Sequence, residues 1–379
     1  MSGDGAMNVR DDAGKGLPLH GLRVVSLAEQ YPGPYATLLM ADLGAQVILV
    51  ERPGQGDPAR GFPGFHAALN RNKRAVAVDL KSDEGRSALR GLLADADVVL
   101  EGFRPGTMAR LGFGYEDVAR INPRLVYVSI SGFGQDGPYR DRPAHDLSYQ
   151  AIAGLLFRQA RSGKVEPPGD LAVGDLASAM FAVVGTLAAL HQRERTGRGE
   201  YVDVSMTDGL VSWMSVFLGP QMNREELADI AAEPAYGTFR CGDGKLLTLS
   251  IAHEDWFWSP LCGLLDMPDA AALRRPERVA RFDPLRDRIA RALARAPRAT
   301  WAQRLDEAAI PWGPVNDLHD VVEDPHFRAR GLFRDVPEGG GTRRAVAQPL
   351  RFGDSHPGPV RGTPAVGEGN ADLIGTRSR

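Results

Sequence analysis

The stretch LRVVSLAEQYPGPYATLLMADLGAQVILVERP, residues 22–53, decides the fold of this chain. Residues 21–30 form a short apolar run rich in β-branched side chains, and residues 32–45 show the apolar spacing of a helix. Residues 46–53 form a second apolar run that is typical of a buried strand. A strand, a helix and a strand within about 30 residues predict a βαβ unit, and such units build parallel sheets.

The same alternation continues along the chain. Residues 81–96 read as a helix with Ser82 as its N-cap and acidic residues in its first turn. Residues 97–103 and 124–134 have strand patterns, and a short helical pattern lies between them at 115–122. We therefore predict an α/β fold whose large domain is a doubly wound, Rossmann-like sheet.

The turn after the first strand lacks the fingerprint of a dinucleotide site. Such a turn carries G-x-G-x-x-G, which lets the backbone approach a pyrophosphate closely. Residues 28–36, AEQYPGPYA, have a single glycine between two prolines instead. A nucleotide-dependent dehydrogenase is therefore the weakest alternative for this chain.

The second half of the chain predicts a smaller α+β domain. A buried helix is expected at 176–199, and an Asp-Gly hairpin signal lies between two strand-like runs in residues 239–252. Two Arg/Ala-rich amphipathic helices are expected within 278–309. The predicted organisation is a disordered tail at 1–18, a first part of the large domain at 19–222, a small domain with linkers at 223–325, and a C-terminal segment at 326–379 that returns to the large domain.

Charge and cysteine content exclude several classes of protein. The formal net charge of −3 provides no general attraction for nucleic acid or an anionic membrane. The two cysteines, Cys241 and Cys262, lack the partners of a disulfide framework or a zinc site, so we expect no metal. We expect no membrane segment, because no window approaches the roughly 18 apolar residues that a spanning helix needs. The N-terminus lacks a signal peptide pattern, which favours a cytoplasmic protein.

Basic side chains follow the predicted strands. Because the carboxyl ends of parallel strands share one rim, we expect these cations to form a local site for an anion such as a phosphate. The residues in this group are Arg52, Arg71, Lys73, Arg74, Lys81, Arg104 and Arg110.

Three residues are candidates for acid, base or nucleophilic chemistry. Asp175 directly precedes the buried helix, so it is predicted to be an N-cap, and a capping carboxylate can also act on a bound carbonyl. His145 lies at a loop end and titrates near neutrality, although a lone loop histidine is more often a surface residue. Asp146, beside it, is expected to cap or anchor the loop.

Five segments, taken in order, resemble the signature segments of the class III CoA-transferase family, which includes the α-methylacyl-CoA racemases. These segments are residues 22–60, LNRNKRAVAVDLKSDEG, residues 96–138, GDLASA and RTGRGEYVDVSMTDG. The resemblance implies a large α/β domain, a smaller middle domain and two chains interlocked into a homodimer. It also implies an acyl-CoA substrate bound on the basic rim, with no cofactor beyond the coenzyme A of that substrate.

The resemblance also implies roles for individual residues. Asp175 matches the catalytic aspartate of the family, and His145 stands where the racemases have a histidine followed by an aspartate. Glu254 matches, more loosely, an acidic residue that the racemases place near the site. The residues that match CoA contacts are Tyr31, Pro32, Arg52, Val78, Asp79, Leu80, Lys81, Gly102, Phe103, Arg104 and Arg110.

Two chemistries follow from this assignment. Our main prediction is racemisation of an α-branched acyl-CoA, with His145 and Asp175 on opposite faces of the α-carbon and the helix amides after Asp175 holding the enolate oxygen. The alternative is transfer of CoA to a carboxylic acid through an acyl-aspartyl anhydride and an aspartyl-CoA thioester on Asp175. A non-catalytic acyl-CoA-binding subunit is a third possibility.

Overall fold

The computed structural model describes residues 15–159, 169–227 and 232–375. It divides into two compact units, one formed by residues 1–218 and 328–379 and the other by residues 219–327. Most of the predicted N-terminal tail, residues 1–14, lies outside the described part. Unit 1 and unit 2 are the names used below.

Unit 1 is built on a six-stranded parallel sheet in the order β3-β2-β1-β4-β5-β6. Its strands are β1 (Arg23–Ser26), β2 (Gln46–Glu51), β3 (Arg74–Ala77), β4 (Val98–Glu101), β5 (Val126–Ser131) and β6 (Tyr201–Ser205). The strand order reverses between β1 and β4, which is the point where ligands bind in open α/β sheets. The predicted doubly wound α/β architecture is confirmed.

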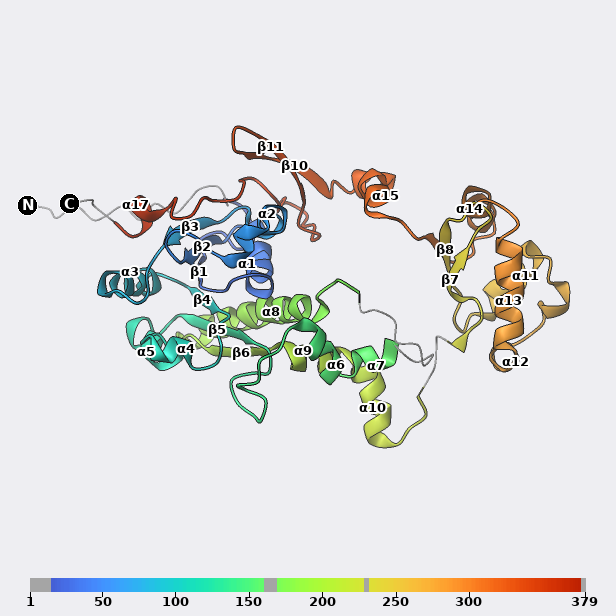
Figure 1. Ribbon diagram of the computed structural model, residues 1–379, viewed down its shortest axis with the longest axis horizontal. Coiled ribbons are helices and arrows are strands. Elements are labelled where there is room, and N and C mark those ends of the chain that lie inside the picture. The colour runs from blue at the N-terminus through green and yellow to red at the C-terminus, as the bar shows by residue number, and fades with distance from the viewer. Residues whose placement is uncertain (1–14, 160–168, 228–231, 376–379) are drawn as a thin grey trace, which may run out of the picture. The chain divides into compact units, whose positions relative to one another are not determined.

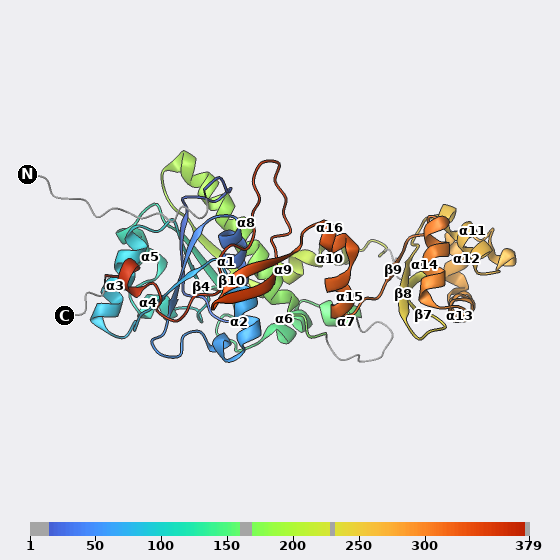
Figure 2. The same cartoon turned by 90° about the horizontal axis from the view of Figure 1, so that it is seen from above.

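Helices cover both faces of this sheet (Figures 1 and 2). On one face, α1 (Pro32–Asp42) packs along α8 (Val173–Thr196). The other face is covered by α3 (Asp83–Ala94), α4 (Thr107–Arg110) and α5 (Tyr115–Ile121). The predicted cap of α3 is confirmed, since the Ser82 hydroxyl accepts a hydrogen bond from the amide of Gly85 at 3.0 Å.

Unit 1 has further elements besides the sheet and the helices that cover it. They are α2 (Pro63–Asn70), α6 (Asp146–Ile152), α7 (Leu155–Gln159), α9 (Met206–Trp213), the hairpin of β10 (Phe333–Glu338) and β11 (Gly341–Val346), and α17 (Asn370–Leu373). The C-terminal segment joins the sheet through its backbone, because the amide of Gly369 donates to the carbonyl of Ala75 at 2.8 Å. Helix α10 (Ser215–Asn223) begins in unit 1 and ends in unit 2.

Unit 2 has a three-stranded antiparallel sheet, β7-β8-β9. The Asp-Gly hairpin joins β7 (Tyr236–Arg240) to β8 (Leu246–Ser250), as predicted. The other elements are β9 (Trp312–Pro314), α11 (Asp255–Leu264), α12 (Arg275–Ala280), α13 (Phe282–Leu293), α14 (Arg298–Glu307), α15 (Leu318–Glu323) and α16 (Pro325–Ala329), which runs into unit 1.

Helix α8 corrects one expectation about membranes. It is long and apolar enough to cross a membrane by length and composition, with a mean hydropathy of 1.8 over its most apolar window. The sequence analysis predicted that no such window exists. Half of the window is buried within the protein, where α8 packs against α1, β5 and β6. Burial in the core is a sufficient reason for its apolar composition.

Candidate active site

The carboxyl edge of the sheet gathers the segments predicted to contact CoA. Strands β1 to β4 run parallel, so the residues that follow each strand emerge at the same edge. These residues are Tyr31 and Pro32 after β1, Arg52 after β2, Val78, Asp79, Leu80 and Lys81 after β3, and Gly102, Phe103 and Arg104 after β4. Arg110 ends the short helix α4 that comes next.

Three of the predicted rim cations lie elsewhere. Arg71, Lys73 and Arg74 precede or begin β3, so they do not follow its carboxyl end. Arg71 is buried and its guanidinium pairs with Asp42 at 2.6 Å, while Arg74 pairs with Asp372 at 2.8 Å. Lys73 is completely buried, and burial lowers the pKa of its ammonium well below the usual range. Arg71 and Lys73 are therefore buried within the fold, and Arg74 is paired with the C-terminal segment.

The sequence predicted that Asp175 is the N-cap of α8, and this prediction is wrong. The helix begins earlier, at Val173, and Ala172 is its N-cap. Asp175 therefore lies in the first helical turn, partly exposed. Within the described residues, its carboxylate has no hydrogen-bond or ion-pair partner. A carboxylate that caps nothing is free to act on a substrate.

The first turn of α8 is capped from a different helix. The Asp146 carboxylate accepts hydrogen bonds from the amides of Gly174, at 2.7 Å, and Asp175, at 3.1 Å. Its other oxygen accepts from the side chain of Gln150. Asp146 is the first residue of α6, whose N-cap is His145, so it anchors α6 to α8 and does not cap its own helix.

This cap requires glycine at position 174. A Cβ there would lie 2.8 Å from Asp146 Oδ1 and 3.2 Å from Leu210 Cδ1. Contacts of that length force the neighbouring atoms to move, and here the nearest neighbour is the capping oxygen itself. The glycine of the GDLASA motif thus allows the close approach of the Asp146 carboxylate.

The capping also corrects the predicted position of an oxyanion site. The amides of Gly174 and Asp175 are occupied by Asp146, and the amide of Leu176 donates to the carbonyl of Ala172 at 3.1 Å. The amide directly after Asp175 is therefore used within the helix. The expectation that the amides after Asp175 hold an enolate oxygen has no support in this geometry.

Burial, with a smaller contribution from the negative charge of Asp146, raises the pKa of Asp175 to about 7. Burial is also the main reason that the pKa values of the Tyr31 and Tyr149 phenols are raised, with smaller contributions from the charges of Asp175 and Asp146. The two phenols and the two carboxylates thus share one electrostatic environment. A carboxylate of raised pKa is a stronger nucleophile and base than an ordinary one.

The raised pKa predicts the pH dependence of any reaction that uses the Asp175 carboxylate. The charged form is lost as the pH falls below about 7, so kcat/KM should decline about tenfold per pH unit on the acid side. Asp146→Asn should move this decline to lower pH, because it removes a like charge and retains one oxygen for the helix amides. A pH profile of both proteins measures the shift, and an inflection that stays in place or moves upward would contradict the electrostatic coupling.

A cavity of about 300 Å³ in unit 1 is lined by Tyr149, Met206 and a group of arginines, among other residues. Its cationic lining residues are Arg104, Arg110, Arg140 and Arg142. Two of them converge on Gly106, since a Cβ there would lie 3.2 Å from a guanidinium nitrogen of Arg110 and 3.2 Å from one of Arg140. Asp141 is the only acidic residue among those that line this cavity in the described part of the chain. Such a lining suits an anionic ligand.

The sequence analysis missed Arg140 and Arg142. Both lie in the turn-rich loop between β5 and α6, at the same sheet edge as Arg104. Arg140 Nε donates to the carbonyl of Gln135 at 2.9 Å, and the Arg142 guanidinium lies over the Tyr139 ring. The rule that selected Arg104, a cation after the carboxyl end of a strand, would also have found them.

The structure places the other two predicted catalytic residues as follows. His145 is exposed, and its imidazole has no polar partner within the described residues. Glu254 is in unit 2 at the N-cap of α11, where its carboxylate accepts a hydrogen bond from the amide of Ala252 at 2.8 Å. That hydrogen bond is the main reason that the pKa of Glu254 lies below its ordinary value. A catalytic part for either residue stays a prediction.

Comparison with known proteins identifies the family. Residues 19–370 match the model of CoA-transferase family III. The chain belongs to CoA-transferase family III. The succinyl-CoA:mesaconate CoA-transferase of Haloarcula hispanica is 35% identical over an alignment that covers 94% of this chain and 95% of that protein.

Two further similar proteins span most of the chain. The acetyl-CoA:oxalate CoA-transferase of Acetobacter aceti is 32% identical, covering 83% of this chain and 85% of that protein. A CAIB/BAIF family protein from Brucella suis has a solved structure that is similar to this one, with a TM-score of 0.84 and 30% identity. That comparison covers 94% of this chain and 98% of the Brucella chain. The resemblance inferred from the sequence is confirmed.

Proposed function

We propose that this family III enzyme transfers CoA from an acyl-CoA to a carboxylic acid, with Asp175 as the nucleophile. The observation that carries the proposal is the Asp175 carboxylate itself, which is partly buried, has a pKa raised to about 7 and makes no polar contact within the described residues. Asp146 supports this state by capping the helix in place of Asp175. A nucleophile needs such a free and basic oxygen.

The first half of the proposed reaction forms a thioester on the enzyme. An oxygen of Asp175 attacks the carbonyl carbon of the acyl-CoA, the C–S bond breaks and the CoA thiolate leaves. The thiolate then attacks the Asp175 carbonyl of the mixed anhydride, which releases the donor acid and leaves aspartyl-CoA. The second half reverses these steps with the acceptor carboxylate and regenerates the Asp175 carboxylate. No net proton is taken up or released.

The arginine-lined cavity supports a place for the phosphates of CoA. Guanidinium groups bind phosphate oxygens in pairs, and Arg104 and Arg110 were already predicted to contact CoA from the family resemblance. Tyr149 also lines the cavity and shares the electrostatic environment of Asp175. We therefore propose that CoA lies with its phosphates at the arginines and its sulfur toward Asp175.

Transfer is better supported than racemisation, our main prediction from the sequence. The two named relatives described above are CoA-transferases. Racemisation also needs a second acid or base opposite Asp175 and a donor for the enolate oxygen. The amides of Gly174, Asp175 and Leu176 are already used, and His145 is exposed. We propose racemisation only as the second candidate, on the basis of the His-Asp sequence.

Two assays separate these candidates. The first measures exchange of CoA between succinyl-CoA or acetyl-CoA and mesaconate or oxalate, the acids for which the relatives are named. The second incubates the enzyme with (S)-2-methylacyl-CoA in deuterated water without an acceptor acid. We expect acceptor-dependent exchange and no deuterium at Cα. Deuterium incorporation without any exchange would establish proton transfer and overturn the proposal.

His145→Ala distinguishes the two chemistries within one variant. In CoA transfer we expect a change in kcat of less than about tenfold, because the imidazole has no bond to make or break. A positioned acid or base contributes about 10²- to 10⁴-fold, so a racemase would lose at least that much. Leu147→Ala, at an exposed position on the same helix, is the matched control. A loss of exchange activity above about 100-fold would assign His145 a direct part.

We also propose that the enzyme is a homodimer, the state that the family resemblance implies. Apolar side chains on α8 and α9 support an interface, because Met180, Val184, Val211 and Trp213 are all exposed in unit 1. The interlocked arrangement of the two chains and the cytoplasmic location stay predictions. Sedimentation of the purified protein measures its oligomeric state.

A further inference from the structure

The loop between β1 and α1 contains a strained residue next to the candidate active site. Gln30 has a φ of 67°, in the left-handed region that residues other than glycine rarely adopt. The next residue, Tyr31, is the N-cap of α1. A strained backbone persists only where its surroundings hold it in place. The contacts that hold Gln30 therefore also set the position of Tyr31.

Asp57 makes these contacts. Its carboxylate accepts the amide hydrogen of Gln30, with N–O distances of 3.1 Å and 3.3 Å to its two oxygens. One of the same oxygens accepts from the amide of Ala59 at 2.8 Å and so caps the short 3₁₀ helix at Pro58–Gly61. Asp57 is only 5% exposed. The Asp57 carboxylate is thus buried and hydrogen-bonded to the backbone amides of both Gln30 and Ala59.

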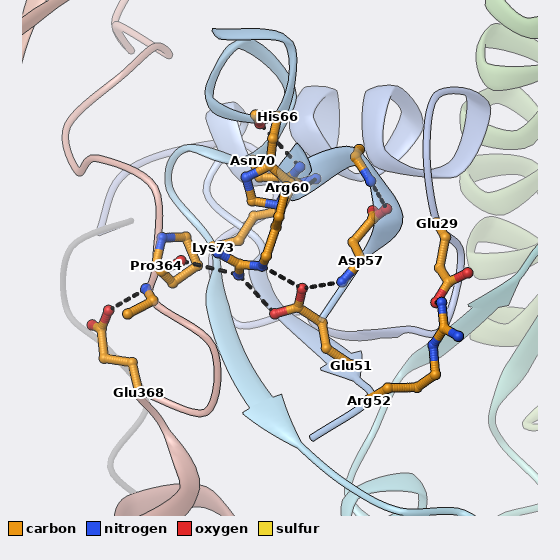
Figure 3. A network of polar contacts seen from close by, with 12 residues as sticks. Glu29, Glu51, Arg52, Asp57, Arg60, His66, Asn70, Lys73, Pro364 and Glu368 are labelled. Carbon is orange, nitrogen blue, oxygen red and sulfur yellow. Dashed lines mark hydrogen bonds and ion pairs between the residues drawn. The ribbon is translucent and has the colours of Figure 1, made fainter. Parts of the chain in front are cut away.

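A second buried carboxylate holds Asp57 (Figure 3). Glu51, at the end of β2, accepts from the amide of Asp57 at 2.9 Å and pairs with Arg60 through two hydrogen bonds of 2.7 Å. Gly56 leaves room for this arrangement, because a Cβ there would lie 2.7 Å from Glu51 Oε1. Arg60 thus holds Glu51, Glu51 holds Asp57, and Asp57 holds the backbone of Gln30.

The first turn of α1 is also fixed from its other side. Lys73 donates to the carbonyl of Pro34 at 2.8 Å and to the Thr37 hydroxyl at 2.9 Å. A Cβ at Gly33 would lie 2.1 Å from the Cβ of Ala28, so the turn packs tightly against the residues that precede it. With the helix held by Lys73, the conformation of Gln30 is a further determinant of how the chain enters α1.

The topology of unit 1 places Tyr31 at the same edge of the sheet as Asp175. Helices α1 and α8 both begin at the carboxyl edge of the parallel sheet and pack against each other. Their first turns therefore lie at the same edge. The charge of Asp175 contributes to the raised pKa of the Tyr31 phenol, after the larger effect of burial, which supports this placement. A phenol of raised pKa keeps its proton and can donate it in a hydrogen bond.

We propose that Asp57 is a positioning residue for CoA transfer, which holds Gln30 in its strained conformation so that the Tyr31 hydroxyl donates to the reacting carbonyl oxygen at Asp175. This inference rests on the proposed function. The reaction needs such a donor, because negative charge develops on that oxygen when the carboxylate attacks. The amides of Gly174, Asp175 and Leu176 do not provide it, since Asp146 and Ala172 accept their hydrogens.

The test is a double-mutant cycle of Asp57→Asn and Tyr31→Phe, measured as kcat for CoA exchange. Asparagine keeps the shape of Asp57 and can still cap the amide of Ala59, but its NH₂ group would face the amide of Gln30. We expect Tyr31→Phe to lower kcat roughly 100-fold and Asp57→Asn to lower it about 10- to 100-fold. The double variant should be no slower than Tyr31→Phe, because Asp57 acts through Tyr31. Additive losses would overturn the proposal.

Asp42→Asn is the matched control. Asp42 is a fully buried carboxylate at the opposite end of α1, bound to Arg71 and Asn72, so its loss should lower the thermal midpoint and leave kcat unchanged. If Asp42→Asn lowers kcat as much as Asp57→Asn does, the effect of Asp57 is general stability and the proposal fails.

Amide hydrogen exchange separates this proposal from the proposed function. Asp57→Asn should speed exchange in the segment 27–34, and exchange across β4 to β6 should stay unchanged, whether or not the enzyme transfers CoA. Unchanged exchange in 27–34 would show that Asp57 does not hold the loop. Faster exchange without CoA transfer by the wild-type protein would preserve the structural hold and refute the catalytic part.

Discussion

Replacing Asp175 with asparagine is expected to lower the rate of CoA exchange by roughly 10⁴-fold or more, the usual consequence of removing a catalytic nucleophile. The amide has the shape of the carboxylate but cannot attack a thioester. Exchange of isotopically labelled CoA between an acyl-CoA and an acceptor acid measures the loss. Activity within tenfold of the wild type would remove Asp175 from the mechanism.

The same substitution should not harm the fold. Asparagine removes the cost of burying a charge beside Asp146, and the caps of Gly174 and Asp175 use backbone amides that remain. The thermal midpoint of Asp175→Asn should therefore equal or exceed that of the wild type near pH 8. A large fall in the midpoint would mean that the loss of activity reports unfolding and not chemistry.

Removing both Arg104 and Arg110, the two cavity arginines that were predicted from the sequence, should weaken CoA binding by about 100-fold. A hydrogen bond to a charged group contributes about 1.5 to 3 kcal/mol, so we expect about a tenfold loss for each of Arg104→Ala and Arg110→Ala and about 100-fold for both together. Calorimetric titration with CoA measures the affinity. The difference in CoA affinity between the wild type and the double variant should become smaller as the salt concentration rises.

Arg120→Ala is the control for this experiment. Arg120 is an exposed arginine at the end of α5, paired with Asp117 and absent from the lining of the cavity. Its removal changes the net charge of unit 1 by the same amount as one cavity variant and should leave the affinity unchanged. An equal loss from Arg120→Ala would mean that the cavity has no specific part in binding CoA.

The sequence was sufficient to predict the sheet and the residues at its carboxyl edge. Apolar runs such as residues 46–53 are local patterns, and a parallel sheet then places the residues after each strand at one edge. Arg52 and Arg104 were found in this way. The segment NRNKR was placed wrongly because Arg71 and Lys73 come before β3 and Arg74 begins it, and only the register of β3 shows this.

The capping of α8 was beyond local patterns. The residue that caps a helix normally lies directly before its first turn, and for this reason Asp175 was predicted to be the cap. Here the cap is Asp146, from a helix earlier in the chain, and nothing in the residues around Val173 indicates a partner so distant in sequence. Asp146 was expected to cap its own loop or helix. It caps the first turn of α8 instead, so the Asp175 carboxylate is not used as a cap.

The buried polar networks could not be predicted from the sequence either. Glu51, Asp57 and Lys73 are charged residues that composition alone would place on the surface, yet each is buried with polar partners. Some of their partners, such as Gln30 for Asp57 and Pro34 for Lys73, come from segments that only the folded structure brings together. The strain at Gln30 likewise has no counterpart in the sequence, where glutamine gives no hint of a left-handed backbone.

The most direct test of the proposed mechanism follows oxygen atoms. The acceptor acid is labelled with ¹⁸O in its carboxylate, and the donor acid released over several turnovers is analysed by mass spectrometry. Transfer through Asp175 predicts that ¹⁸O passes from the acceptor to the Asp175 carboxylate and then into the donor acid. Complete exchange of CoA with no ¹⁸O in the donor acid would contradict an anhydride on Asp175.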